Sequence, residues 1–210
     1  MHATFKFKQA EIGKFKSNEA GRVSASLHKD CRIYGFTMGE FSLIDLIYSI
    51  LQKTGSANVI TATWSAGIKD AHQIKWMLDS DLIQTYRIIT DRSFETRQQK
   101  YALSLEQLFG RENIRTSNIH AKFTLIWNAD WRIVIRTSMN LNANKTCETF
   151  EIEEGDGLFD FHMDFCRTID ETMPVGFCGE KWRANESLKR FIYSDDQPEQ
   201  KSTKKWYETE

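Results

Sequence analysis

Apolar side chains recur every three or four residues after Ser42, which is the spacing of one face of an α-helix. The apolar positions are Leu43, Ile44, Leu46, Ile47, Ile50 and Leu51. Serine is a residue type that caps helix N-termini, and Gly55 follows at a place typical of a helix end. The pattern predicts a helix that begins after Ser42 and ends before Gly55.

The chain then alternates between strand-like and helical patterns. β-Rich runs at residues 58–64 and 83–90 predict strands, and helical spacing at residues 70–79 and 94–109 predicts helices. Strands that alternate with helices are typical of parallel pairing and of a layered α/β fold. Later elements are expected as strands at residues 122–127, 131–136 and 148–153 and a helix at residues 158–173.

The turn Asn128-Ala129-Asp130 between two of these strands predicts a hairpin, so part of the sheet is antiparallel. Pro174 ends the last helix. The predicted fold class is therefore α/β, with a mixed but mostly parallel sheet sandwiched by helices.

Length and composition indicate one ordinary domain, because the 210 residues are 40% hydrophobic and contain only 11 Gly and 2 Pro. We expect an N-terminal extension at residues 1–40, with an edge strand at residues 4–8 and a basic loop, and an α/β domain at residues 41–176. A polar tail or partner-docking segment is expected at residues 177–210. The basic and aromatic residues near the N-terminus leave open a nucleic-acid-binding arm. No apolar run suggests a membrane span or a signal segment, so a cytoplasmic location without membrane attachment is expected.

The net charge of -1 gives no overall attraction to nucleic acid, so such binding has to come from a local basic patch. No CxxC pair occurs among the four cysteines, so reduced thiols are expected, with Cys147 as a small buried side chain. His162 and Cys166 are four residues apart on a predicted helix, but their phenylalanine neighbours favour an ordinary packed face. No metal site is predicted.

The residues with a chemical signature follow in order: His120-Ala121-Lys122, then the hairpin, then Ser138-Met139-Asn140, then Glu148. Alternation along a strand would place His120 and Lys122 on the same face. The hairpin would return the chain so that Ser138 and Asn140 lie beside them. A nucleophile, a cation and an amide donor would then be within reach of one phosphate.

This arrangement resembles the phospholipase D superfamily, whose motif is His-x-Lys, a strand, Ser-x-Asn and an acidic residue. The resemblance covers about residues 41–173 and is strongest at residues 119–152. It implies a phosphodiesterase that needs no metal or cofactor, in which the motif histidine attacks phosphorus and a second histidine protonates the leaving oxygen. The resemblance assigns catalytic roles to His120, Lys122, Asn140 and Glu148. Glu148 is expected to hydrogen-bond a histidine ring.

One copy of the motif supplies one histidine where the mechanism uses two, so the resemblance implies a site shared across the axis of a homodimer. Small members of the family with one motif are mostly nucleases, which makes DNA or RNA the expected substrate. Ser138 is expected to contact substrate. Arg92 and Arg97 follow a predicted parallel strand, where α/β proteins bind ligands, and are expected to line a phosphate groove. A solvated helix start would explain both arginines too.

Two positions depart from the family pattern. Trp127 stands where the family has aspartate, and Thr137 stands where it has glycine, so a Cβ could narrow the space for phosphate. These departures favour an alternative, a non-catalytic nucleic-acid-binding or assembly module that retains the fold. A third possibility is a structural protein whose tail docks a partner.

Overall fold

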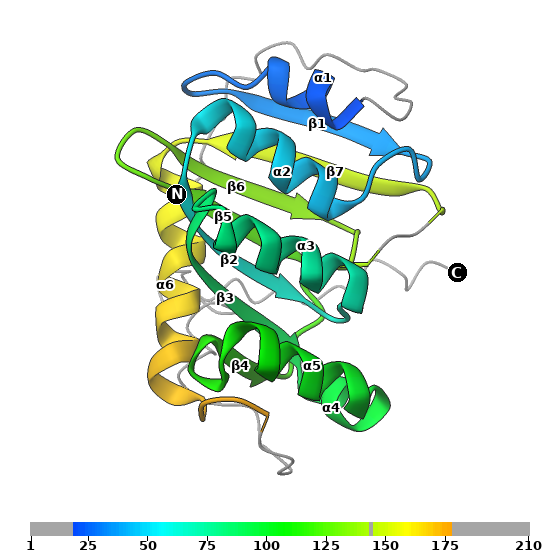
Figure 1. Ribbon diagram of the computed structural model, residues 1–210. Coiled ribbons are helices and arrows are strands. Elements are labelled where there is room, and N and C mark those ends of the chain that lie inside the picture. Colours follow the sequence, from blue (N-terminus) through cyan, green and yellow to red (C-terminus); the bar gives the residue numbers. More distant parts are fainter. Residues whose placement is uncertain (1–18, 143–144, 178–210) are drawn as a thin grey trace, which may run out of the picture.

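The computed structural model describes residues 19–142 and 145–177, in which one seven-stranded sheet lies between two layers of helices (Figure 1). The strands are β1 (Arg32–Thr37), β2 (Ala57–Thr63), β3 (Ile83–Asp91), β4 (Ile114–Ser117), β5 (Phe123–Trp127), β6 (Arg132–Thr137) and β7 (Glu148–Glu154). The helices are α1 (Glu19–Ala25), α2 (Leu43–Thr54), α3 (Ile68–Asp79), α4 (Ser93–Arg97), α5 (Gln99–Phe109), the short 3-10 helix η1 (Arg111–Asn113) and α6 (Asp156–Thr172).

The α/β fold class and the sandwich are confirmed, but the expectation of a mostly parallel sheet is wrong. The strand order is β1-β7-β6-β5-β2-β3-β4, and only the β2–β3 and β3–β4 pairs are parallel. The four pairs from β1 to β2 are antiparallel.

The connection between β4 and β5 explains the change of direction. Residues 118–122 join the two strands without a helix. Five residues span at most about 17 Å. That length is enough to pass the ends of β3 and β2, at about 4.8 Å per strand, and to reach β5. It is not enough to return along the length of the strands to their opposite ends as well. The chain therefore re-enters the sheet from the edge at which it left, and β5 runs antiparallel to β2. This connection carries His120 to the middle of that edge.

Each face of the sheet packs against its own layer of helices. Val59, Ile88 and Ile133 belong to the core beneath α2, α3 and α5. Their strand neighbours Ile60 and Val134 point the other way and pack under α6. In Figure 1, α2, α3 and α5 lie in a row over one face of the sheet.

Local sequence signals account for the helix ends. Ser42 caps α2 in a capping box with Asp45, and Gly55 follows the helix at a positive φ of 81°. The predicted helix at residues 94–109 is divided into α4 and α5 at Gln98, whose φ of -140° and ψ of 54° are not helical. The hairpin between β5 and β6 forms as predicted, because Asn128 Oδ1 accepts hydrogen bonds from the backbone of the turn.

Residues before position 41 contribute to the sheet domain. β1 pairs with β7 over six residue pairs, and α1 packs on α2 through a hydrogen bond between Ser24 and Ser49. The predicted edge strand at residues 4–8 and most of the predicted tail lie outside the described residues. The sheet domain therefore includes residues on both sides of the boundary that the sequence predicted at residue 40.

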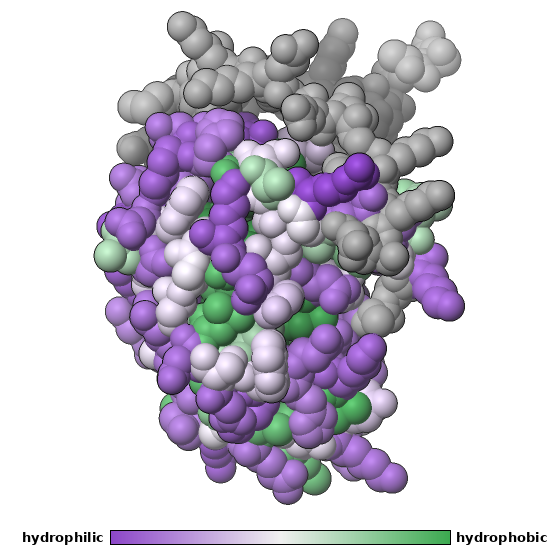
Figure 2. Space-filling model, turned by 45° about the horizontal axis from the view of Figure 1, so that its top comes forward, coloured by the Kyte–Doolittle hydropathy of each residue, from purple (hydrophilic) through white to green (hydrophobic). Residues whose placement is uncertain are grey.

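The surface seen in Figure 2 is mostly hydrophilic, and its apolar areas are small and separated by polar side chains. None of the helices within residues 19–142 and 145–177 has both the length and the apolar character to cross a membrane.

Candidate active site

All seven strands begin or end at one edge of the sheet. The pairing registers place the ends of β1, β2, β3, β4 and β6 there, together with the starts of β5 and β7. The arrowheads of β2, β3 and β6 point to this edge in Figure 1. Side chains that are far apart in sequence are thus brought together where the β4–β5 connection passes.

His120 and Lys122 both precede β5, which begins at Phe123 rather than at residue 122. They lie side by side through a direct contact, not through strand alternation. The Lys122 ammonium donates a hydrogen bond to the His120 carbonyl at 2.8 Å and lies 3.4 Å from His120 Nδ1. The second distance is longer than an ordinary hydrogen bond. The imidazole is exposed to solvent, as an attacking group has to be.

Burial lowers the pKa of Lys122, and the negative charge of Glu148 acts in the opposite direction. A half-buried ammonium loses part of its hydration, so it gains more from an anionic partner than a fully solvated one does. A phosphate bound beside Lys122 would therefore replace part of the hydration that its ammonium group has lost.

The segment after β6 crosses the start of β5 to reach the end of β2. The backbone of Leu141 is held there by two hydrogen bonds. Its amide donates to the Ser65 carbonyl at 3.2 Å, and its carbonyl accepts from the Gly67 amide at 2.7 Å. The hydroxyl of Thr63 also accepts a hydrogen bond from the Leu141 amide at 3.2 Å. These contacts fix Asn140 over the His120 edge. The Thr63 hydroxyl lies 3.4 Å from Asn140 Oδ1, and within the described residues Nδ2 makes no hydrogen bond.

Glu148 and Ser138 are paired across the β6–β7 turn. The Ser138 hydroxyl donates to the Glu148 carboxylate, and the hydroxyl of Thr146 donates to the other carboxylate oxygen at 3.2 Å. The expected bond from Glu148 to a histidine ring stays a prediction. Cys147, which precedes Glu148, is exposed, so the expectation that it is buried is wrong. It lies in the loop before β7 rather than in a strand, and no core side is available to it there.

Thr137, the residue that replaces the family's glycine, has a structural role in the turn. Its hydroxyl donates to the Thr149 carbonyl at 2.7 Å and accepts from the Met139 amide at 3.0 Å. Among the described residues only Asp30 and Asp81 are non-glycine positions with positive φ, so the backbone at Thr137 does not require glycine. Trp127, the other departure, lies at the far end of β5 and packs on Phe159 with 5.9 Å between ring centroids.

The two predicted phosphate-groove arginines follow β3 at the same edge. The Arg92 amide donates to the Ser117 carbonyl at 2.9 Å, which places this residue beside the end of β4. Arg97 reaches across to the end of β2, where its guanidinium carbon lies 3.8 Å from the centre of the Trp64 ring. Trp64 also approaches His120, with 5.5 Å between ring centroids. The sequence pattern placed Trp64 at the end of the predicted strand at residues 58–64 and gave no local signal for its contact with His120.

No group of three His, Cys, Asp or Glu side chains within the described parts of the chain could hold a metal ion. His162 is half-buried, its Nδ1 donates to the Leu158 carbonyl, and burial lowers its pKa. Cys166 is buried in the core under α6.

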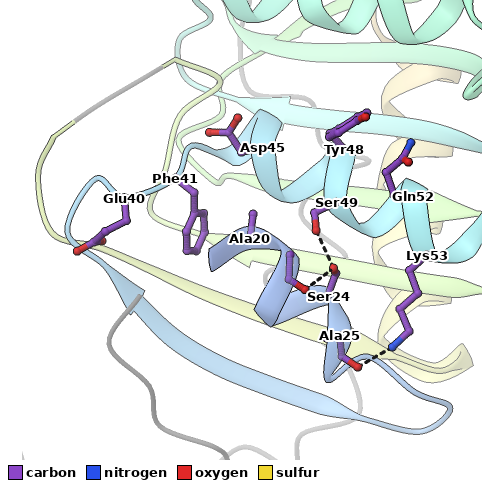
Figure 3. A pocket seen from close by; sticks show the side chains of 11 residues that line it. Ala20, Ser24, Ala25, Glu40, Phe41, Asp45, Tyr48, Ser49, Gln52 and Lys53 are labelled. Carbon is purple, nitrogen blue, oxygen red and sulfur yellow. Dashed lines mark hydrogen bonds between the residues drawn. The ribbon is translucent and has the colours of Figure 1, made fainter. Parts of the chain in front are cut away.

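A cavity of about 690 Å³ lies between α1 and α2, away from the His120 edge (Figure 3). Several of its polar side chains are engaged with the protein: Ser24 bonds Ser49, Lys53 donates to the Ala25 carbonyl, and Asp45 caps α2. The cavity is therefore a gap between two helices with a mixed apolar and polar lining.

Comparison with known proteins identifies the fold of the chain. No protein-family model and no curated protein sequence matches the chain. Among solved structures, NucT from Helicobacter pylori is similar with a TM-score of 0.51 and 19% identity, over 70% of this chain and 100% of NucT. Nuc from Salmonella typhimurium, a phospholipase D family member, is similar with a TM-score of 0.50 and 12% identity, over 70% of this chain and 99% of Nuc. The chain thus has the phospholipase D-like fold, which confirms the fold that the motif resemblance implied.

Proposed function

We propose that this protein is a metal-independent phosphodiesterase of phospholipase D type, and that it cleaves nucleic acid through a phosphohistidine at His120. The observation that carries the proposal is that His120, Lys122 and Asn140 lie at the same edge of the sheet, in the fold shared with Nuc and NucT. A solvent-exposed nucleophile, a half-buried cation and an amide donor form the set that phosphoryl transfer uses.

In the proposed first step, a His120 ring nitrogen attacks phosphorus and forms a P–N bond while the P–O bond to the leaving strand breaks. The Lys122 ammonium and the Asn140 amide hold the non-bridging oxygens. Their N–H groups stabilise the charge that increases on these oxygens in the transition state. Water then attacks phosphorus, breaks the P–N bond and releases the second product.

The leaving oxygen needs a proton in the first step, and the attacking water has to lose a proton in the second step. A second imidazole can serve both steps because its usual pKa of about 6.5 is close to neutral pH. We assign this role to His120 of the partner subunit in a homodimer, because the chain has one His-x-Lys motif. The active site in this proposal spans the two-fold axis.

Trapping of the covalent intermediate tests the proposal. The protein is incubated with an oligonucleotide labelled with ³²P, denatured in alkali, digested and analysed by mass spectrometry for a peptide in which the His120 ring is linked through phosphorus to the retained part of the strand. His120→Ala should abolish the label and the cleavage, whereas the matched control His72→Ala, which alters an exposed histidine on α3, should leave both unchanged. Cleavage should survive excess EDTA.

The alternative of a non-catalytic nucleic-acid-binding module gives a different result in the same experiment. It would bind the oligonucleotide without shortened products and without label. Cleavage that disappears with EDTA and returns with magnesium would instead indicate a metal-dependent mechanism. Either result would contradict the proposed chemistry.

A further inference from the structure

Trp64, the first residue after β2, contacts two groups of the candidate active site. Its ring centroid lies 5.5 Å from that of His120, with 51° between the ring planes. The guanidinium carbon of Arg97 lies 3.8 Å from the centre of the indole ring. Both distances are within the usual ranges for aromatic pairs and for cation–π contacts. One half-buried indole thus contacts both the proposed nucleophile and a cation.

Arg97 is held by hydrogen bonds as well as by the indole. Its Nη2 donates to the Trp64 carbonyl at 3.2 Å, and its Nε donates to the Ser93 hydroxyl at 3.0 Å. Ser93 is itself fixed, because its amide donates to Asp91 Oδ1 at 2.9 Å and its hydroxyl donates to the same oxygen. The guanidinium is therefore tied to the ends of both β2 and β3.

A restrained guanidinium is well suited to bind phosphate. An unrestrained arginine side chain loses much rotamer entropy when a ligand orders it, and here much of that ordering is already present. Arg97 is exposed, and among the described residues its Nη1 has no hydrogen-bond partner. Nη1 remains available for a phosphate oxygen.

The contacts of the described residues include no hydrogen bond between Arg97 and His120; both pack on the indole instead. The phosphate that is attacked has its own ligands in Lys122 and Asn140. Arg97 is thus placed for a neighbouring phosphate of the same strand. Because the guanidinium covers one face of the indole, that face is closed to a stacked nucleobase.

We propose that Trp64 is a positioning residue for cleavage, and that it holds the His120 ring and the Arg97 guanidinium in a fixed relation. Arg97 binds a phosphate that flanks the scissile one, so the preferred substrate is a strand with more than one phosphate. This inference rests on the proposed function of the His120 edge as a phosphodiesterase site.

Kinetics on two substrates test the division of roles. The first substrate is a DNA oligonucleotide, and the second is bis(p-nitrophenyl) phosphate, which has a single phosphate. Arg97→Gln should raise KM about tenfold for the oligonucleotide, as expected for the loss of about 1.4 kcal/mol, and should leave the small substrate within about twofold. Trp64→Leu should lower kcat about tenfold on both substrates and should also raise KM for the oligonucleotide, because Arg97 loses the indole that holds it. Trp64→Phe should restore most of both losses.

Matched controls separate these effects from general loss of stability. Trp76→Leu alters an exposed tryptophan on α3, and Arg167→Gln alters an exposed arginine on α6. Neither residue lies at the His120 edge, so both variants should keep wild-type kinetics. Circular dichroism and thermal melting of every variant identify those that fail to fold, and Trp64→Phe keeps the test valid if Trp64→Leu fails.

A spectroscopic measurement tests the contact without reference to turnover. The His120 ring proton signal, assigned by its loss in His120→Ala, should shift in Trp64→Leu, because the ring current of the indole is removed, and should not shift in Trp76→Leu. An unchanged His120 signal, or equal effects of Arg97→Gln on both substrates, would overturn this inference. If the wild-type protein cleaves and both Trp64→Leu and Arg97→Gln cleave at the same rate, this inference is overturned while the proposed function stands. Absence of any cleavage by the wild-type protein would overturn the proposed function itself.

Discussion

The Ser138 hydroxyl donates a hydrogen bond to the carboxylate of Glu148 and so joins the end of β6 to the start of β7. The same hydroxyl accepts a hydrogen bond from the Thr149 amide at 2.9 Å, and the Ser138 amide donates to the Thr149 carbonyl at 3.1 Å. Ser138 is thereby engaged on three sides with the next strand. It supports the position of Glu148, and the charge of Glu148 in turn acts on Lys122. Direct contact of Ser138 with substrate remains a prediction.

The first prediction concerns the pH dependence of cleavage. Burial lowers the pKa of Lys122 and Glu148 raises it, so Glu148→Gln should lower this pKa further. Lys122 would then lose its proton at a lower pH, and the alkaline limb of the kcat/KM profile should move toward acid. Measured pH–rate profiles of the wild type, Glu148→Gln and the control Glu171→Gln, at the exposed end of α6, test this. An alkaline limb that stays in place in Glu148→Gln would show that Lys122 does not set it.

The second prediction ranks the groups that act on phosphate. His120→Ala should abolish turnover, whereas Lys122→Ala and Asn140→Ala should each cost about 2 to 4 kcal/mol of transition-state stabilisation, by analogy with the loss of an oxyanion donor. The measurement is kcat/KM on one oligonucleotide. Lys75→Ala on α3 is the control for loss of a lysine, since Lys75 forms an ion pair with Asp79 on the same helix. Wild-type rates in His120→Ala would remove His120 from the mechanism.

Local patterns in the sequence identified the long elements of the fold but not the sheet direction. The helix after Ser42 has a cap, a periodic face and a terminating glycine, so each signal agrees with the others. β4 was missed because its four residues are too few for a periodic pattern. The antiparallel entry of β5 depends on where β4 lies in the strand order, and spacing along the chain does not contain that information.

The candidate site also combines features that the local sequence specifies with contacts that only the fold creates. The pairing of His120 with Lys122 comes from residues two apart, which a motif can specify. The contact between Trp64 and His120 joins the ends of β2 and the β4–β5 connection, and it exists only because the connection passes over β2. Comparison with the glycine of the family motif predicted that the Thr137 side chain could narrow the space for phosphate. In the structure its hydroxyl bonds the Thr149 carbonyl and the Met139 amide, so the side chain supports the turn.

The third prediction uses Thr137 to separate stability from access. Thr137→Gly restores the residue of the family motif but removes both hydroxyl hydrogen bonds and frees the unfolded backbone. We expect the free energy of unfolding to fall by about 1 to 2 kcal/mol, with little gain in kcat. Chemical denaturation and oligonucleotide kinetics measure the two effects. A large rise in kcat would show that the threonine side chain restricts the phosphate position.

The fourth prediction concerns the shared site. Light scattering should give a mass about twice the 24.5 kDa of the chain. When wild type and His120→Ala are mixed under conditions that let subunits exchange, total activity should fall with the square of the wild-type fraction, because both histidines are needed in one dimer. A linear fall, or a monomer that still cleaves, would show that each chain works alone.

The last prediction concerns the location of positive charge. The net charge of the chain is -1, so binding of nucleic acid has to come from cations gathered at the His120 edge, with Lys122, Arg92 and Arg97 as the candidates. The affinity of the inactive His120→Ala protein for a single strand should fall as salt rises, with a log–log slope of about -0.7 for each phosphate neutralised. Reversal of Arg92 and Arg97 to Glu in that protein should weaken binding to all sequences alike and make the slope shallower by at least about 1.4. Arg167→Glu on α6 is the control, because an exposed cation away from the edge should leave the slope unchanged. Equal slopes for the Arg92 and Arg97 reversals and the control would mean that the strand binds elsewhere on the protein, and the groove at the ends of β2 and β3 would lose its assignment.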